Sequence, residues 1–202
     1  MISNTIIKVG AYEVNCAVLW NGNGALVVDP GQDAESILGV ISEKSLELRG
    51  ILLTHGHFDH VNGIPGLLEK YPEAPVYMHP ADWVMFGHPM NRNPPDYPGV
   101  DRPANLCDIR KMSEDFPSFG FEVMETPGHT PGSVCIKSGD CLFSGDTLFA
   151  GSCGRTDFPG GSMADMRKSL AKLAKLDAGT KVLPGHGPAT TIGYEVANNP
   201  FM

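Results

Sequence analysis

Short apolar runs separated by turn-forming residues dominate the first half of the chain. Val, Ile, Leu and aromatic residues fill these runs, a composition typical of β-strands. The sequence Asn-Gly-Asn-Gly at 21–24 lies between two of the runs and predicts a hairpin turn. The strands predicted in this half are residues 5–10, 14–20, 24–31, 48–54 and 74–79.

Apolar residues at helical spacing interrupt these strands twice. Residues 33–45 predict a helix with one apolar face, and Asp33 is its expected N-cap. Residues 63–72 predict a second helix that ends at Pro72. The first half therefore begins with strands alone and continues with strands and helices in alternation.

The second half repeats this pattern of strands followed by a helix. Its predicted strands are residues 121–128, 133–139, 141–149 and 180–187. Residues 162–176 predict an amphipathic helix, and we interpret its Met and Leu face as core packing rather than a cofactor site. The residues on that face are Met163, Met166, Leu170, Leu173 and Leu176.

One long segment, residues 86–105, has no periodicity. Pro, Gly and Asn dominate it. Long irregular segments inside compact domains are commonly functional or mobile. Two interpretations follow, a flap over a site and a mobile surface insertion.

Composition and charge narrow the class of protein. The chain has 202 residues, is 42% apolar and carries a formal net charge of −8, which argues against nucleic acid and anionic membranes as main partners. Five cysteines at irregular spacing, without a CxxC, argue against a disulfide framework or a structural zinc site. The N-terminal residues do not resemble a signal peptide, and no apolar run is long enough for a membrane helix. We therefore expect a cytoplasmic protein.

The strongest chemical signal is the sequence "THGHFDH" at 54–60. His55, His57, Asp59 and His60 directly follow the apolar strand 48–54. Imidazole and carboxylate groups are ligands for zinc, iron and manganese. In the tight loop after this strand the alternate residues His55, His57 and Asp59 can project from one side, and Gly56 lets the backbone bend close to a metal. This density of ligands predicts a metal site.

Three further candidate ligands each follow an apolar strand and a glycine. His129 stands in "TPGHTPG", Asp146 in "FSGDTLF" and His186 in "LPGHG". Catalytic metal sites draw ligands from distant chain segments, and together with the cluster these residues make a set of five His and two Asp that suits two metal ions. The remaining histidines are interpreted as an outer or surface residue, His79, and a solvated loop residue, His88.

In this order, "THGHFDH", "PGHTPGS", "SGDTLF" and "PGHG" resemble the metallo-β-lactamase superfamily. The resemblance implies an α+β fold, a four-layer αββα sandwich with the metal site at one edge of the two sheets. It also implies that one metal takes His55, His57 and His129 and that the other takes Asp59, His60 and His186. Asp146 would bridge the two metals together with a hydroxide.

Within that superfamily the chain is similar to short bacterial glyoxalase II proteins, the hydroxyacylglutathione hydrolases. "GSCGRTDFPGGS" at 151–162 and "TTIGYEVANNPF" at 190–201 carry this likeness. We expect one domain over residues 1–202 without the C-terminal helical glutathione-binding domain, since only a short segment follows His186. The likeness implies that Arg155 binds a substrate carboxylate; otherwise Arg155 is a loop residue, for example one paired with Asp157.

The resemblance implies a hydrolase that cleaves a small thioester, S-acylglutathione, with two divalent metal ions. Zinc is the first expectation, with iron or manganese as alternatives. A hydroxide shared by the metals would attack the carbonyl, and Asp59 would also orient water. Cys153 is interpreted as a buried turn residue.

Two alternatives stay open. One is a persulfide dioxygenase with a single iron held by His55, His129 and Asp146; the other is a hydrolase of a different ester or lactone, or a binding module that kept the site. The oligomeric state is not predicted.

Overall fold

The computed structural model, which describes residues 2–202, contains two β-sheets packed face to face. The first sheet has six strands in chain order. β1 pairs antiparallel with β2 and β2 with β3, whereas β3 to β6 run parallel. The strands are β1 (Ser3–Val9), β2 (Val14–Asn21), β3 (Gly24–Val28), β4 (Glu47–Leu52), β5 (Val76–Met78) and β6 (Leu106–Asp108).

The second sheet has five strands in the order β13-β12-β9-β8-β7. Its β12 and β9 are parallel, and its other neighbours are antiparallel. These strands are β7 (Phe121–Glu125), β8 (Val134–Ser138), β9 (Cys141–Gly145), β12 (Lys181–Pro184) and β13 (Thr190–Thr191). A separate two-stranded ribbon contains β10 (Leu148–Phe149) and β11 (Ser152–Cys153).

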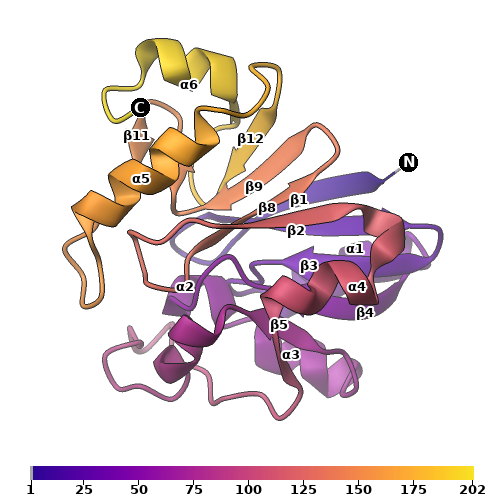
Figure 1. Cartoon of the computed structure of the whole chain (residues 1–202). Coiled ribbons are helices and arrows are strands. Elements are labelled where there is room, and N and C mark those ends of the chain that lie inside the picture. The colour runs from indigo at the N-terminus through magenta and orange to yellow at the C-terminus, as the bar shows by residue number, and fades with distance from the viewer. Residues whose placement is uncertain (1) are drawn as a thin grey trace.

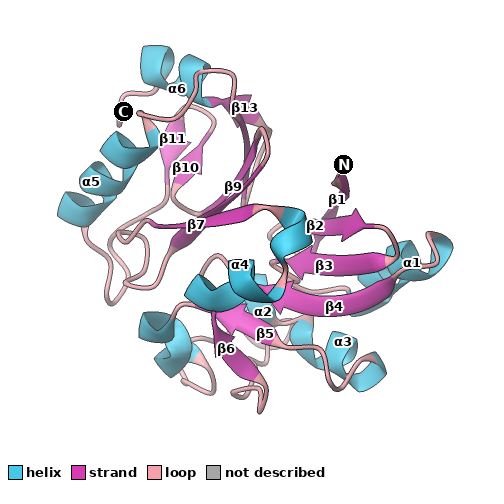
Figure 2. Cartoon of the chain, turned by 45° about the vertical axis from the view of Figure 1, so that its right-hand side comes forward, coloured by secondary structure: helices cyan, strands magenta, loops and turns pink. Residues whose placement is uncertain are grey.

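Helices cover the outer face of each sheet (Figures 1 and 2). α1 (Ala34–Glu43) and α3 (Ile64–Lys70) pack on the first sheet, and α5 (Met163–Leu173) and α6 (Ile192–Asn198) lie against the second. Three apolar cores separate the four layers, one between the sheets and one under each pair of helices. The fold is the expected αββα sandwich.

β2 shows why its sequence is a nearly continuous apolar run. Cys16 and Val18 face the core under α1 and α3, whereas Ala17 and Leu19 face the core between the sheets. Side chains alternate along a strand, so a strand covered on both faces needs apolar residues at every position.

The predicted helices and hairpin are confirmed, with one correction at the start of α1. Asn21 pairs with Gly24 across the predicted turn, and the Met and Leu face of α5 packs into the outer core. Asp33, however, adopts a left-handed conformation (φ 54°) and makes no side-chain cap. Its carboxylate instead accepts a hydrogen bond of 2.8 Å from the Gly10 amide. Asp33 therefore ties the β1–β2 turn to α1.

Several short elements were not predicted. The expected strand 141–149 is broken at Asp146, where the chain turns between β9 and β10. The other unpredicted elements lack a long periodic pattern, and α6 is the longest helix among them. They are α2 (Phe58–Val61), the 3₁₀ helices η1 (Pro80–Met85), η2 (Ile109–Lys111) and η3 (Pro117–Phe119), α4 (Met112–Asp115), α6 and the strands β6, β11 and β13.

The segment 86–105 has no named helix or strand, but its middle is anchored. Tyr97 is 1% exposed, and its ring lies 5.1 Å from that of Phe58 in the predicted metal-binding loop. The Gln32 side chain donates a hydrogen bond of 2.9 Å to the Asp96 carbonyl. These contacts place the segment beside the metal-binding loop and argue against a freely mobile insertion.

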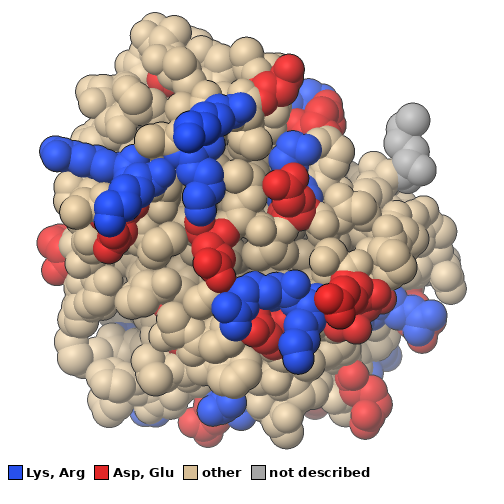
Figure 3. Space-filling model, in the orientation of Figure 1, with Lys and Arg blue, Asp and Glu red and all other residues tan. Residues whose placement is uncertain are grey.

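The surface charge is unevenly distributed. Lys and Arg side chains gather over α5, which carries Arg167, Lys168 and Lys172 (Figure 3). The negative formal charge of the whole chain therefore coexists with a locally basic face. Across residues 2–202, no helix has the length and hydropathy needed to cross a bilayer.

The core between the sheets predicts a large stability effect at Ile136 on β8, which is fully buried there. Ile136→Ala removes methyl groups that the opposite sheet cannot replace, so we expect a loss of about 2–5 kcal/mol in the free energy of unfolding. Urea denaturation of the metal-loaded protein measures it. Val84→Ala is the control because Val84 is 74% exposed, and an equal loss there would contradict the expectation.

Candidate metal centre

All seven predicted ligands converge at one edge of the two sheets. Four of them lie in the loop after β4 and in α2, and the others follow β7, β9 and β12. Each ligand therefore comes from the carboxyl end of a strand, and both sheets contribute. The seven are His55, His57, Asp59, His60, His129, Asp146 and His186.

The donor atoms form overlapping groups of three. Within each group all of them lie within 4.8 Å of one another. His57 Nδ1 lies 2.8 Å from His129 Nε2 in one group, and His60 Nε2 lies 3.3 Å from His186 Nε2 in another. The groups are His55, His57 and His129; His55, His60 and Asp146; and Asp59, His60 and His186.

Asp146 lies between the first and last of these groups. Its Oδ2 is 3.5 Å from His129 Nε2 and 3.7 Å from His186 Nε2, and its Oδ1 is 3.4 Å from His60 Nε2. One carboxylate thus faces ligands of both groups. This is the position that a bridging ligand requires.

The glycine before His186 makes this approach possible. A Cβ atom at Gly185 would lie 2.3 Å from Asp146 Oδ1 and 2.8 Å from His60 Cε1. The strand-glycine-ligand pattern of the sequence therefore has a steric cause here, since a side chain at 185 would fill the centre.

Burial keeps two of the imidazoles neutral at neutral pH. Desolvation lowers the pKa of His55 well below its usual range and lowers the pKa of His57 to about 4. A neutral imidazole has a free lone pair, which is the form that binds a metal ion. Both rings therefore present ligand atoms at pH 7.

The carboxylates favour positive charge at the centre. Burial acts to raise the pKa of Asp146, but the neighbouring His60 and His129 outweigh it and hold that pKa below its ordinary value. Burial acts to lower the pKa of His60, but the neighbouring Asp146, Asp59 and Asp29 outweigh it and raise that pKa. The cluster is therefore built to accommodate cationic charge.

The residues present fit divalent metal ions. His55 Nε2 and Asp146 Oδ1 are buried and have no hydrogen-bond partner. Buried polar atoms normally have partners, so these two, aimed into a cluster of donors, indicate ligation. Mixed nitrogen and oxygen donors suit zinc, iron and manganese, and the donor set does not distinguish among them.

Hydrogen bonds to the outer ring nitrogens orient three of the histidines. His55 Nδ1 lies 3.1 Å from Thr54 Oγ1, His129 Nδ1 lies 2.7 Å from the Arg155 carbonyl, and His186 Nδ1 lies 2.9 Å from the Tyr12 carbonyl. Each contact directs the Nε2 atom of that ring inward.

Sequence reasoning missed Asp29, which supports the centre from behind. Its carboxylate accepts hydrogen bonds of 2.8 and 2.7 Å from the Thr54 amide and hydroxyl. Its Oδ2 also lies 3.1 Å from His60 Nδ1. The available signal was its place at the end of β3, an apolar strand that runs into an acidic residue, as β9 runs into Asp146.

Arg155 lies beside the His57 end of the centre. It forms a bidentate pair with Asp157, both contacts at 2.7 Å, and its guanidinium lies 3.9 Å from the centroid of the Phe158 ring. That ring packs edge-on against His57. The Arg155 side chain is 57% exposed, so a ligand can reach it. The Asp157 carboxylate already bonds to its guanidinium group.

The other singled-out residues lie outside the ligand groups. His79 caps η1 and contacts Glu125, and His88 is exposed. Cys153 is half-buried in β11, and burial raises the pKa of its thiol. All five cysteines are free.

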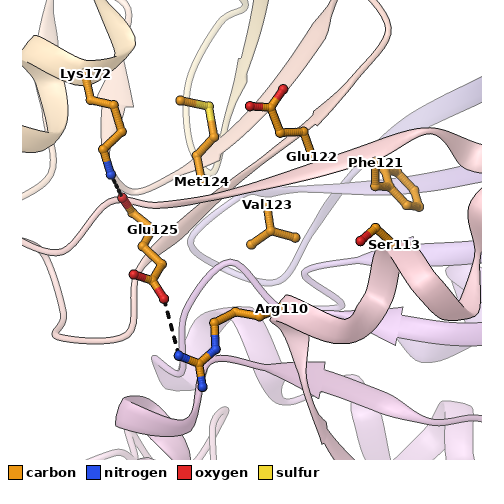
Figure 4. A pocket seen from close by; sticks show the side chains of 8 residues that line it. All are labelled: Arg110, Ser113, Phe121, Glu122, Val123, Met124, Glu125 and Lys172. Carbon is orange, nitrogen blue, oxygen red and sulfur yellow. Dashed lines mark hydrogen bonds and ion pairs between the residues drawn. The ribbon is translucent and has the colours of Figure 1, made fainter.

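A groove beside β7 is a separate surface feature. Lys172 donates to the Glu125 carbonyl and Arg110 lies 3.5 Å from the Glu125 carboxylate, so Glu125 lies between these two side chains, with Val123 and Met124 beside it (Figure 4). None of the seven ligands lines this groove. We do not assign it to the metal chemistry.

Comparison with known proteins agrees with this geometry. Residues 9–186 match the family described as the Metallo-beta-lactamase superfamily. The chain belongs to this superfamily. It is 34% identical to "Hydroxyacylglutathione hydrolase GloC" of Haemophilus influenzae, over 98% of this chain and 96% of that protein. It is 38% identical to "Probable metallo-hydrolase YqgX" of Bacillus subtilis, over 97% and 95%.

Solved structures show the same fold. The B3 metallo-beta-lactamase BLEG-1 superposes with a TM-score of 0.87 at 35% identity and covers 100% of this chain and 99% of its own. TTHA1623 in a di-iron-bound form gives 0.82 at 37% identity, covering 98% and 100%. ETHE1 from Myxococcus xanthus gives 0.74 at 26% identity, covering 98% and 83%.

The convergent donors predict that metal removal lowers stability. At a thousand times its dissociation constant a bound ion adds about 4 kcal/mol, which for a chain of this size raises the melting temperature by about 10 °C or more. We expect that rise when zinc is added to chelator-treated protein, measured by calorimetry. Calcium is the control because it prefers all-oxygen sites, and an equal shift with calcium would contradict the assignment.

Proposed function

We propose that this protein is a metal-dependent hydrolase that cleaves thioesters through a centre of two divalent metal ions. The observation that carries the proposal is the position of Asp146, which faces both ligand groups. A site for a single ion needs only one group of three, whereas this chain presents a second one, Asp59, His60 and His186. The complete set supports two ions.

When bound, the ions in such a centre lower the pKa of water and polarise the carbonyl oxygen of the substrate. The protein's own residues then orient the reactants. Asp59 Oδ2 lies 3.3 Å from Nε2 of the more exposed His186, and this carboxylate can accept a hydrogen bond from the attacking water. His186 is 27% exposed at its side chain, so substrate reaches the centre from this side.

Water, rather than a side chain, is the proposed nucleophile. Cys153 is the cysteine nearest in sequence to Arg155, and burial raises the pKa of its thiol. A protonated thiol is a poor nucleophile. The thiolate that leaves from a thioester needs little protonation. The proposed reaction therefore requires no general acid for the leaving group.

The likeness to GloC supports an S-acylglutathione type of substrate. Arg155 is the residue we assign to a carboxylate of the thiol portion, because its guanidinium forms bidentate pairs with carboxylates. Its present partner is Asp157, so a substrate carboxylate would exchange with that side chain.

Two other activities are outcomes of the test rather than the proposal. A persulfide dioxygenase would use one iron held by His55, His129 and Asp146. Iron is included in the test because the similar protein TTHA1623 has a di-iron-bound form. A hydrolase of simple esters or lactones would use the same centre with a different substrate.

The proposal predicts that Asp146→Asn abolishes most thioester hydrolysis. The amide cannot bridge two cations as a carboxylate does, so we expect kcat/KM to fall by a factor of about 100–1,000, the usual loss of about 2.7–4 kcal/mol for an electrostatic catalytic group. Thiol release from S-lactoylglutathione measures it, and Asp140→Asn, an exposed surface substitution, is the matched control. Full activity in metal-loaded Asp146→Asn would contradict the two-metal centre.

Elemental analysis of protein purified without added metal or chelator separates the candidate activities. Two equivalents of metal together with faster cleavage of thioesters than of esters and lactones support the proposal. One equivalent of iron, with oxygen uptake on glutathione persulfide, would replace it with the dioxygenase.

A further inference from the structure

Asp82 is a buried carboxylate that connects two of the ligand loops. It lies on η1, is 0% exposed, and its Oδ2 accepts hydrogen bonds of 3.0 Å from the Gly56 amide and 2.7 Å from the Thr130 hydroxyl. Its Oδ1 accepts a third, of 2.7 Å, from the Gly132 amide. Gly56 separates two ligands, His55 and His57. One side chain therefore links the loop after β4 to the loop after β7.

Glycines in both loops make room for this carboxylate. A Cβ atom at Gly132 would lie 2.6 Å from Asp82 Cγ, and one at Gly56 would lie 3.0 Å from Met85 Sδ. The sequence suggested that Gly56 lets the backbone bend toward a metal; in the structure the space beside Gly56 is taken by η1. Both glycines are thus explained by the approach of η1.

Asn91 holds the loop after β4 through the carbonyl of Gly56, the group that Asp82 does not bond. Its side-chain amide donates 2.8 Å to the Gly56 carbonyl and 3.2 Å to the Met85 carbonyl, and the residue is 8% exposed. Gly56 is therefore held at its N–H by Asp82 and at its C=O by Asn91. The segment 86–105 consequently contributes to the ligand loop from outside.

These contacts serve only one of the two ligand groups. His55 and His57 flank Gly56, and Thr130 follows His129, so the contacts support the group of those three histidines. The other group has direct contacts of its own, since Asp29 faces His60 and the Tyr12 carbonyl faces His186; Asp29 also bonds to Thr54, which contacts His55. No hydrogen bond from Asp82 or Asn91 to Asp59, His60 or His186 occurs in the described chain.

We propose that Asp82 and Asn91 are positioning residues that preorganise the His55, His57 and His129 metal site and leave the Asp59, His60 and His186 site unaffected. The inference rests on the two-metal part of the proposed function and not on the thioester substrate. Three rings from two loops bind one ion tightly only if both loops are held in place, because otherwise binding must first order them. The two sites thus differ in what maintains them.

The test measures metal affinity in backgrounds that retain one site each. The His186→Ala background retains the His55, His57 and His129 site. The His57→Ala background retains the Asp59, His60 and His186 site. Asp82→Asn or Asn91→Ala is added to each background, and zinc affinity is measured by competition with a chromophoric chelator. In the His186→Ala background we expect either change to weaken zinc binding about 10- to 100-fold, the usual cost of losing an outer-shell partner. In the His57→Ala background we expect less than about a twofold change, within the error of such competition measurements.

Matched controls exclude a general loss of structure. Asn198→Ala removes an amide that bonds only within α6, and Asp140→Asn changes an exposed carboxylate. Neither should alter zinc affinity in either background. Asn91→Ala removes one donor from an irregular segment and keeps the test available if Asp82→Asn does not fold, as judged by circular dichroism of the metal-free protein.

The proposal is overturned if the added changes weaken zinc binding equally in both backgrounds, or in neither. A wild-type protein that binds only one equivalent of metal overturns it as well. Because the readout is metal affinity, failure of thioester cleavage alone contradicts the proposed substrate and leaves this inference standing.

Discussion

The structure depends on holding five imidazoles and two carboxylates within one partly buried cluster. In each of its three overlapping groups the donor atoms lie within 4.8 Å of one another, and two donor atoms are buried and unpartnered, so the cluster is stable only if charge and geometry are matched. The carboxylates of Asp146, Asp59 and Asp29 make the centre favourable for cations. The four layers of the fold bring these groups to one edge, because both sheets end their strands there.

Support around the ligands is as organised as the ligands themselves. Asp29 stands behind His60, and backbone carbonyls orient His129 and His186. Asp82 and Asn91 hold the peptide of Gly56 between two ligands. Three glycines near the centre have the same origin, since a Cβ atom at Gly56, Gly132 or Gly185 would meet neighbouring atoms at 3.0 Å or less. Rigid support of this kind suits catalysis that relies on orientation of water and substrate.

Family membership indicates the type of chemistry but does not identify the substrate. The superfamily match covers residues 9–186, and the relatives range from a hydroxyacylglutathione hydrolase to a B3 metallo-beta-lactamase. Residues outside the ligand set must therefore select the substrate. Arg155, Asp157 and Phe158 form one exposed unit against His57, so this loop is one of the surfaces that border the proposed centre.

Sequence alone predicted the candidate ligand residues and determined the pattern of strand, glycine and His or Asp and the helices with a clear apolar face, because each depends on local spacing. It did not reveal that Asp33 bonds to Gly10 instead of capping α1, or that Asp29, Asp82 and Asn91 support the ligands. Only the tertiary structure decided which ligands meet. His57 and His129 are 72 positions apart and His60 and His186 are 126 apart, yet their ring nitrogens lie 2.8 and 3.3 Å from each other. Such distances follow from the packing of two sheets, which no local backbone preference encodes.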